Sequence, residues 1–179
     1  VCQMTVEQIK ALDAGSWFDQ RFAGERVPLL TELLDWARGK VRVAIEVKRG
    51  PVPYEGIEQR LLRELTDHRM LEQVAVISFD QPFLRRFKEL EPTVATGTLF
   101  VGMPIEAIAP ARAALADVIL PQFGFVTEEL VRTAHEAGVG VFTWAPQQAD
   151  ELRTQFDSAS YTFDENPTLL VMRAVMFGC

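Results

Sequence analysis

The amino-acid sequence predicts an α/β fold of the parallel (β/α) TIM-barrel type, incomplete, with about six of the usual eight βα units. Short apolar and β-branched runs alternate with amphipathic stretches, as in the βα units of a parallel sheet. No predicted strand is followed by a glycine-rich phosphate-binding loop, which disfavours a dinucleotide-binding domain. The 179 residues fall short of a complete barrel of roughly 250 by about two units. An open doubly wound sheet is the alternative.

Six segments have the short, apolar and β-branched character of buried strands. They are residues 41–47, 74–79, 94–100, 117–120, 140–144 and 160–164.

Six amphipathic stretches follow these strands and are predicted to be helices. They are residues 54–66, 82–90, 110–116, 127–137, 147–156 and 167–176. Pro82, Pro110 and Pro167 suit the first turn of a helix, where a missing N–H costs little, and Gly138 is a stop signal. Thr5 and Gln8 have the spacing of a capping box, which predicts a further short helix through Leu12.

Composition and charge narrow the possible functions. A formal charge of -7 disfavours binding to nucleic acid or to an anionic membrane surface. Every apolar run is interrupted well before it reaches the length of a membrane span. Cys2 and Cys179 lie at opposite ends, so no disulfide framework is expected. We expect one domain over residues 1–179 and a cytoplasmic location, although a chain that starts at Val1 does not show whether a leader precedes it.

One strand carries paired charges of opposite sign. In segment 41–47 the side chains alternate, so Val43, Ile45 and Val47 share one face. Glu46 and Lys48 lie on the other face, which in a barrel looks inward at the carboxyl-terminal mouth. A carboxylate there can hold a hard divalent cation, and an ammonium can neutralise a phosphate oxygen. A structural ion pair explains the same spacing, and this alternative stays open.

Several segments, in the same order along the chain, resemble the glycerophosphodiester phosphodiesterases. The matching segments are 12–18 (LDAGSWF), 22–25 (FAGE), 27–34, 45–48 (IEVK), 77–79 (ISF), 134–138 (AHEAG) with the strand ending at Trp144, and 164–167. The resemblance covers nearly the whole chain and identifies residues 13–28 as the remainder of an insertion loop of the family.

The resemblance implies a barrel that hydrolyses small-molecule glycerophosphodiesters to glycerol 3-phosphate and an alcohol with a divalent cation, calcium or magnesium. Glu46 matches the metal-binding carboxylate of the family, and Lys48 matches the catalytic lysine beside the substrate phosphate. Trp144 matches an aromatic residue of the pocket wall. Ser78 and Phe79 are expected at the same mouth, in a secondary role.

Trp17 and Phe18 lie in the insertion that overhangs the barrel mouth in the family. They could form an aromatic wall for the glycerol moiety, or they could pack the loop itself. The sequence leaves these two interpretations open.

Other parts of the family pattern have no counterpart in this sequence. The catalytic histidine pair and two further metal carboxylates of the family lie in an amino-terminal segment that does not match this chain. His68 and His135 both fall at or near helices, where a surface or packing role is expected. The family's Trp-Thr-Val-Asn turn reads Trp-Ala-Pro-Gln here, at residues 144–147. A lone carboxylate cannot supply the six to eight oxygens that calcium takes, so we expect this chain by itself to be inactive.

Two further hypotheses follow from the same residues. The chain could be a non-catalytic barrel-like module in which Glu46 and Lys48 form a structural ion pair, a reading that an upstream segment with histidines and acids would exclude. An unclosed barrel would also leave open strand edges, at residues 41–47 and at the last strand. A missing amino-terminal segment or a dimer partner could cover them.

Overall fold

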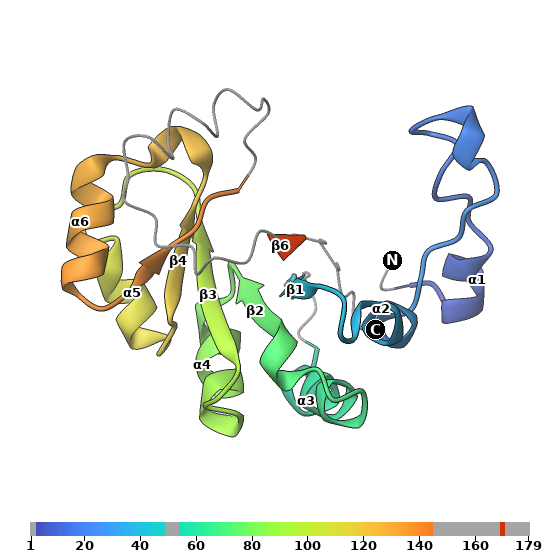
Figure 1. The fold of residues 1–179 in the computed structure, drawn as a ribbon, viewed down its shortest axis with the longest axis horizontal. Helices are drawn as coiled ribbons and strands as arrows, with labels where there is room; N and C mark the ends of the chain where they lie inside the picture. The colour runs from blue at the N-terminus through green and yellow to red at the C-terminus, as the bar shows by residue number, and fades with distance from the viewer. Residues whose placement is uncertain (1–2, 49–53, 145–168, 171–179) are drawn as a thin grey trace.

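A parallel sheet organises the chain in the computed structural model, which describes residues 3–48, 54–144 and 169–170 (Figure 1). The strands are β1 (Arg42–Glu46), β2 (Val74–Ser78), β3 (Ala95–Phe100), β4 (Val118–Pro121), β5 (Gly140–Val141) and β6 (Leu169–Leu170). Their order is β5-β4-β3-β2-β1-β6, and every neighbouring pair is parallel. Within the described residues, β5 and β6 form the two edges of the sheet.

Within the described part of the chain, four helices connect successive strands and overlap predicted helical segments, and two helices precede the first strand. They are α1 (Val6–Lys10), α2 (Leu30–Ala37), α3 (Ile57–Asp67), α4 (Gln81–Leu90), α5 (Ile108–Ala113) and α6 (Glu128–Glu136), with 3-10 turns at Gln20–Phe22, Leu71–Gln73 and Phe123–Phe125. The predicted capping box is confirmed, because Thr5 and Gln8 exchange side chain to backbone hydrogen bonds at the start of α1. Gly138 follows α6 with a φ of 72°, a left-handed conformation that favours glycine.

The apolar residues divide into two clusters, one on each face of the sheet. The larger cluster joins the helices to the strand residues Val43, Ile45 and Val76. The smaller cluster contains Ala44, Ile77, Leu99 and Leu120, with Val118, Phe142 and Trp144 packed against it. The members of the smaller cluster lie on strands or in the segments that follow them, so within residues 3–48, 54–144 and 169–170 the helices cover one face of the sheet. A doubly wound sheet has helices on both faces, so this arrangement favours the barrel type.

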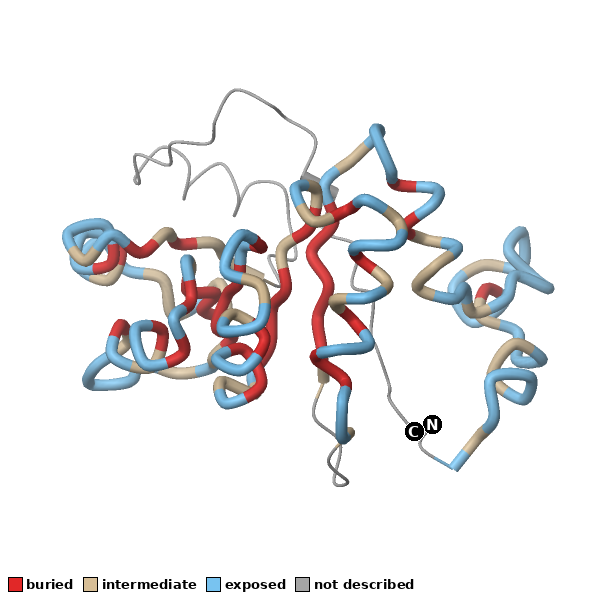
Figure 2. The backbone as a smooth tube through the Cα atoms, turned by 90° about the horizontal axis from the view of Figure 1, so that it is seen from below, coloured by how far each residue is buried: buried red, intermediate tan, exposed pale blue. Residues whose placement is uncertain are grey.

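Burial follows the same division. Figure 2 shows buried residues along the strands and on the helix sides that face them. Gly97 of β3 lies on the inner face, where an added Cβ would collide with the side chains of Leu120 and Val118. By contrast, residues 3–33 are exposed or half-buried, with Gly15 as the exception. None of the helices in the described segments is long and apolar enough to cross a membrane.

Two predicted element ends are wrong for local reasons. The helix predicted at 110–116 ends at Ala113, because Leu115 adopts a left-handed conformation with a φ of 56°. The strand predicted at 140–144 is regular only over Gly140–Val141, after which Trp144 pairs with Gln122 in an isolated bridge.

The end of the chain differs more from the prediction. Leu169–Leu170 form strand β6 and pair with Arg42 and Val43 of β1, so the helix predicted at 167–176 is wrong at these residues. The predicted open edge at 41–47 is wrong for Arg42 and Val43 for the same reason. A short apolar run suits a strand as well as a helix. Here the edge of β1 offers backbone hydrogen-bonding groups to a further strand, which favours the strand. The predicted elements at 147–156 and 160–164 lie outside the described residues.

Helix α4 offers a direct test of the helix-side core. Phe87 is fully buried and stacks on Phe83, whereas Leu90 in the same helix is 44% exposed. Phe87→Ala is expected to lower the free energy of unfolding by about 3–5 kcal/mol, because it leaves a cavity between helix and sheet. Leu90→Ala, the matched control, is expected to change it by no more than about 0.5 kcal/mol. Urea unfolding of both variants checks this, and equal losses would contradict the assigned packing.

Candidate active site

Glu46 and Lys48 lie where the first strand leaves the sheet, on its inner face. Ala44 belongs to the inner cluster, and Glu46, two residues further on, pairs in register with Ile77 of the same cluster. The Glu46 side chain is 1% exposed, and its Oε1 lies 3.1 Å from Lys48 Nζ. The Lys48 side chain is 36% exposed. A buried carboxylate is therefore held beside an ammonium that reaches solvent.

An open pocket of about 580 Å³ borders this pair. It is lined by Glu46, Lys48, Phe79, Asp80, Gln81 and Pro82. These residues come from the end of β1 and from the turn between β2 and α4. Both segments lie at the carboxyl end of the sheet, where ligands bind in parallel α/β proteins.

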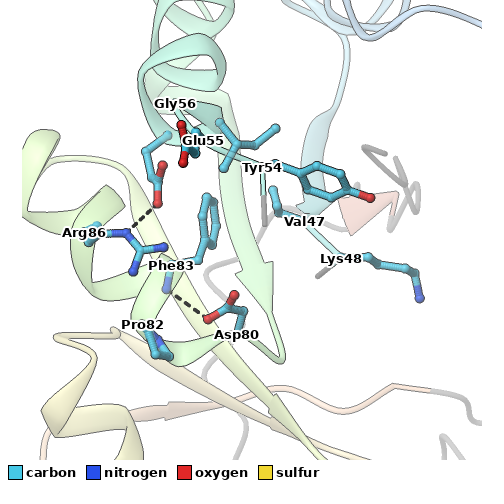
Figure 3. A pocket seen from close by; sticks show the side chains of 11 residues that line it. Val47, Lys48, Tyr54, Glu55, Gly56, Asp80, Pro82, Phe83 and Arg86 are labelled. Atoms are coloured by element: carbon cyan, nitrogen blue, oxygen red, sulfur yellow. Dashed lines mark hydrogen bonds and ion pairs between the residues drawn. The ribbon is translucent and has the colours of Figure 1, made fainter. Parts of the chain in front are cut away.

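A second pocket, of about 480 Å³, lies between the ends of β1 and the helices α3 and α4 (Figure 3). It shares Lys48, Asp80 and Pro82 with the first pocket. Two of its charged side chains pair with each other: Arg86 Nε donates to Glu58 Oε1 at 2.7 Å, and Glu58 is buried. In Figure 3 the Lys48 side chain points away from this pair.

Phe79 and Trp144 form an aromatic contact above the inner face. Their ring centroids lie 5.8 Å apart at an interplanar angle of 87°. Trp144 Nε1 also donates to the Leu120 carbonyl at 3.0 Å, which fixes the indole. Phe79 follows β2 and Trp144 follows β5, with β3 and β4 between them. A flat sheet would hold their backbones about 14 Å apart, so this contact is the expected result of a concave inner face.

Ser78 is fully buried at the end of β2. Its hydroxyl donates to the Val47 carbonyl at 2.6 Å and accepts from the Asp80 N–H at 2.9 Å. The structure therefore brings Ser78 close to the predicted pair through backbone groups. Direct contact of this side chain with a substrate stays a prediction.

Trp17 and Phe18 lie apart from the other predicted residues. They belong to the segment between α1 and α2, which extends away from the sheet (Figure 1), and they are 81% and 71% exposed. Trp17, Phe18 and Phe22 form a row of ring contacts at 5.8 Å and 5.9 Å. The structure does not bring Trp17 or Phe18 to the Glu46 pocket, and their predicted part in a glycerol pocket stays a prediction.

The loop that carries these aromatic residues is closed by Asp13. Its carboxylate accepts hydrogen bonds from the N–H groups of Gly15, Ser16 and Gly24 at 2.9, 2.8 and 2.7 Å. Ala14 and Glu25 close the loop further through a backbone hydrogen bond of 2.8 Å. The backbone N–H of Ser16, followed by those of Gly24 and Gly15, holds the pKa of Asp13 well below its ordinary value.

The two histidines lie away from the pocket. His68 caps the carboxyl-terminal end of α3, and its Nδ1 lies 2.9 Å from Asp35 Oδ1. His135 lies in the last turn of α6. Helices that connect parallel strands end at the amino-terminal side of the sheet, opposite to the pocket, and His68 is half-buried whereas His135 is exposed, so both positions agree with the surface or packing role expected.

Asp80, Gln81 and Pro82 line the pocket although sequence reasoning gave them no part in it. Asp80 caps α4, with its Oδ1 accepting from the Phe83 N–H at 3.2 Å. Their position in the sequence, directly after the strand segment 74–79, could have indicated that they line the pocket. The turns that follow parallel strands lie together at one end of the sheet.

A model of the glycerophosphoryl diester phosphodiesterase family matches residues 1–159 of the chain. The chain belongs to this family. A glycerophosphodiester phosphodiesterase of Caldanaerobacter subterraneus subsp. tengcongensis is 33% identical over 153 residues, which cover 85% of this chain. The chain spans 63% of the length of that relative.

Solved structures of phosphodiesterases share the fold. A protein of Silicibacter pomeroyi DSS-3, assigned as such an enzyme, superposes with a TM-score of 0.76 at 26% identity, over 87% of this chain and 62% of its own. An Oleispira antarctica phosphodiesterase superposes with a TM-score of 0.72 at 17% identity, over 98% of this chain and 67% of its own. The family and the barrel type predicted from the sequence are thereby confirmed.

The Asp13 loop gives a pH-dependent prediction. Because folding lowers the pKa of Asp13, the loop hydrogen bonds stabilise the fold above the ordinary aspartate pKa and are lost as pH falls through the lower, folded-state pKa. An NMR titration of the Asp13 carboxyl carbon is expected to show a midpoint below the ordinary value of 3.8. Asp13→Asn is expected to speed hydrogen exchange at Gly24. A midpoint at or above the ordinary value would contradict the described loop.

Proposed function

We propose that the complete protein hydrolyses glycerophosphodiesters to glycerol 3-phosphate and an alcohol, and that the pocket beside Glu46 and Lys48 holds the phosphodiester. The observation that carries this proposal is the buried carboxylate 3.1 Å from a solvent-reaching ammonium, at the carboxyl end of a parallel strand and open to a pocket. Family membership supports the same chemistry. The Oleispira antarctica phosphodiesterase, which shares the fold, is a complex with the product sn-glycerol 3-phosphate.

Lys48 is the proposed catalytic residue. Its ammonium neutralises a non-bridging oxygen of the phosphodiester and stabilises the charge that builds up there as the bond to the alcohol breaks. Glu46 holds the ammonium in place before substrate binds. Phe79 and Trp144 are proposed to form the apolar wall on which the non-phosphate part of the substrate rests.

Glu46 is also the proposed protein ligand for a calcium or magnesium ion. Its carboxylate is the hard oxygen donor that such a cation prefers, and a bound cation would compete with Lys48 for it. Residues 3–48, 54–144 and 169–170 contain no cluster of three or more His, Cys, Asp or Glu side chains suited to a metal. One carboxylate is far short of the six to eight oxygens of calcium, so we propose that the 179-residue chain alone binds the cation weakly and does not turn over substrate.

Removal of the Lys48 charge tests the proposal. In the full-length protein, Lys48→Met is expected to lower kcat for release of glycerol 3-phosphate from glycerophosphocholine by about 100-fold or more, as for loss of a group that stabilises the transition state. The matched control is Lys10→Met, which breaks an exposed Lys–Glu pair of 2.6 Å with Glu32. The control is expected to retain the wild-type rate, and full activity of Lys48→Met would exclude the proposed role.

The second candidate function is a non-catalytic barrel-like module. The specific observation in its favour is that Glu46 and Lys48 already form an ion pair, with Glu46 almost completely buried. In that case the pair closes the end of β1 against the pocket and serves stability alone. The absence of glycerol 3-phosphate release by the wild-type full-length protein, with added calcium or magnesium, would favour this function.

The contribution of the Glu46–Lys48 ion pair to the stability of the fold can be measured whichever function is correct. Lys48→Met leaves a buried carboxylate without its ammonium, a change that costs about 3–5 kcal/mol for a fully buried pair. Because 36% of the Lys48 side chain is exposed, screening reduces the expected loss to about 2 kcal/mol. Glu46→Gln is expected to lower the free energy of unfolding by less than Lys48→Met, since the Lys48 ammonium can turn toward water. Urea unfolding decides this, and a larger loss for Glu46→Gln would contradict the described burial.

A further inference from the structure

The Ser78 hydroxyl joins the two segments that form the pocket. On one side it donates to the Val47 carbonyl, at 2.6 Å. On the other side it accepts from the N–H of Asp80, at 2.9 Å, where the turn into α4 begins. One segment contributes Glu46 and Lys48 to the pocket, and the other contributes residues 79–82.

Val47 is fixed to β2 through both of its backbone groups. Its N–H donates to the Ile77 carbonyl at 2.9 Å, and its carbonyl accepts from Ser78. In a parallel ladder a strand carbonyl normally accepts from a backbone N–H of its neighbour, and here a side chain donates to it. Val47 lies between Glu46 and Lys48 in the sequence. Its two hydrogen bonds to β2 therefore fix the backbone that joins the members of the ion pair.

The side chain of Ser78 lies on the helix-facing side of the sheet. Val76, two residues earlier in β2, belongs to the helix-side cluster, and Ile77 belongs to the inner cluster. Ser78 is fully buried, and the pocket beside Glu46 opens on the inner side. The hydroxyl therefore acts on the pocket through the backbone that it binds.

We propose that Ser78 is a positioning residue for the active site. Its hydroxyl holds the end of β1 against the turn between β2 and α4, and so sets where the Lys48 ammonium stands relative to Glu46. This inference rests on the proposed phosphodiesterase function. A displacement of a catalytic group by about 1 Å can lower the rate by about 100-fold, so a hydroxyl that touches no substrate can still control turnover.

The test compares Ser78→Ala with Ser78→Thr in the full-length protein. Ser78→Ala removes the donor and is expected to lower kcat for glycerophosphocholine by about 10-fold or more, with KM changed less than threefold. Ser78→Thr keeps the hydroxyl and is expected to recover most of the lost kcat. The assay is run well below the melting temperature of every variant, so that loss of folded protein does not contribute.

Thr96→Val is the matched control. Thr96 is a fully buried hydroxyl residue near the amino end of β3, away from the pocket, and its Oγ1 lies 3.3 Å from Asp117 Oδ2. The control is expected to lower the melting temperature but to leave kcat unchanged. Equal loss of kcat in Thr96→Val and Ser78→Ala, or an unchanged kcat in Ser78→Ala, would overturn the positioning role.

A second readout does not depend on turnover. The ¹⁵N-labelled ammonium of Lys48 is expected to give a distinct NMR signal in the wild type and in Ser78→Thr, and to lose that signal in Ser78→Ala as the group becomes mobile. An unchanged Lys48 signal in Ser78→Ala would overturn the inference even if the protein hydrolysed no glycerophosphodiester. Loss of the signal with no hydrolysis by the wild type would retain the positioning and reject the phosphodiesterase function.

Discussion

The parallel register between β1 and β2 is the constraint on which the rest of the structure depends. Glu46 pairs with Ile77, and the Val47 N–H donates to the Ile77 carbonyl. Because side chains alternate along a strand, a shift of one residue would turn Glu46 and Lys48 into the helical layer and bring Val47 to the inner face. The hydrophobic pattern opposes this shift, since Val43, Ile45 and Val47 belong to the helix-side apolar cluster and would have to leave it.

The curvature of the sheet brings the ends of separate strands together beside the Glu46 pocket. The helices of the described residues lie on one face, and on the other, concave face the ends of β2 and β5 come together through Phe79 and Trp144 although two strands separate them. The pocket thus combines a charged side, from the end of β1, with an aromatic side. Asp80 is the N-cap residue of α4 and also lines the pocket, so the side chain that starts the helix helps to form the pocket wall.

Local sequence patterns predicted most of this arrangement. Features that depend on contacts between residues far apart in the sequence could not be predicted. Alternation in 41–47 indicated which way Glu46 points, and the Thr5 capping box and Gly138 marked helix ends. Strand β6 could not be predicted, because a partner far away in sequence decides its conformation. The role of the Ser78 hydroxyl needed the same kind of information, since its acceptor lies 31 positions earlier in the chain. The exposure of Trp17 and Phe18 likewise depends on where their loop lies relative to the sheet.

The Glu46–Lys48 pair is common to the two candidate functions, because its geometry suits both the proposed catalysis and a purely structural role. An ammonium beside a buried carboxylate suits the proposed contact with a phosphate oxygen, and the same ion pair offsets the cost of burying Glu46. A crystal structure of the full-length protein with sn-glycerol 3-phosphate separates these uses most directly. We expect a phosphate oxygen within hydrogen-bonding distance of Lys48 Nζ, in the pocket with Phe79 and Gln81. A ligand bound elsewhere, with Lys48 still paired only to Glu46, would contradict this expectation.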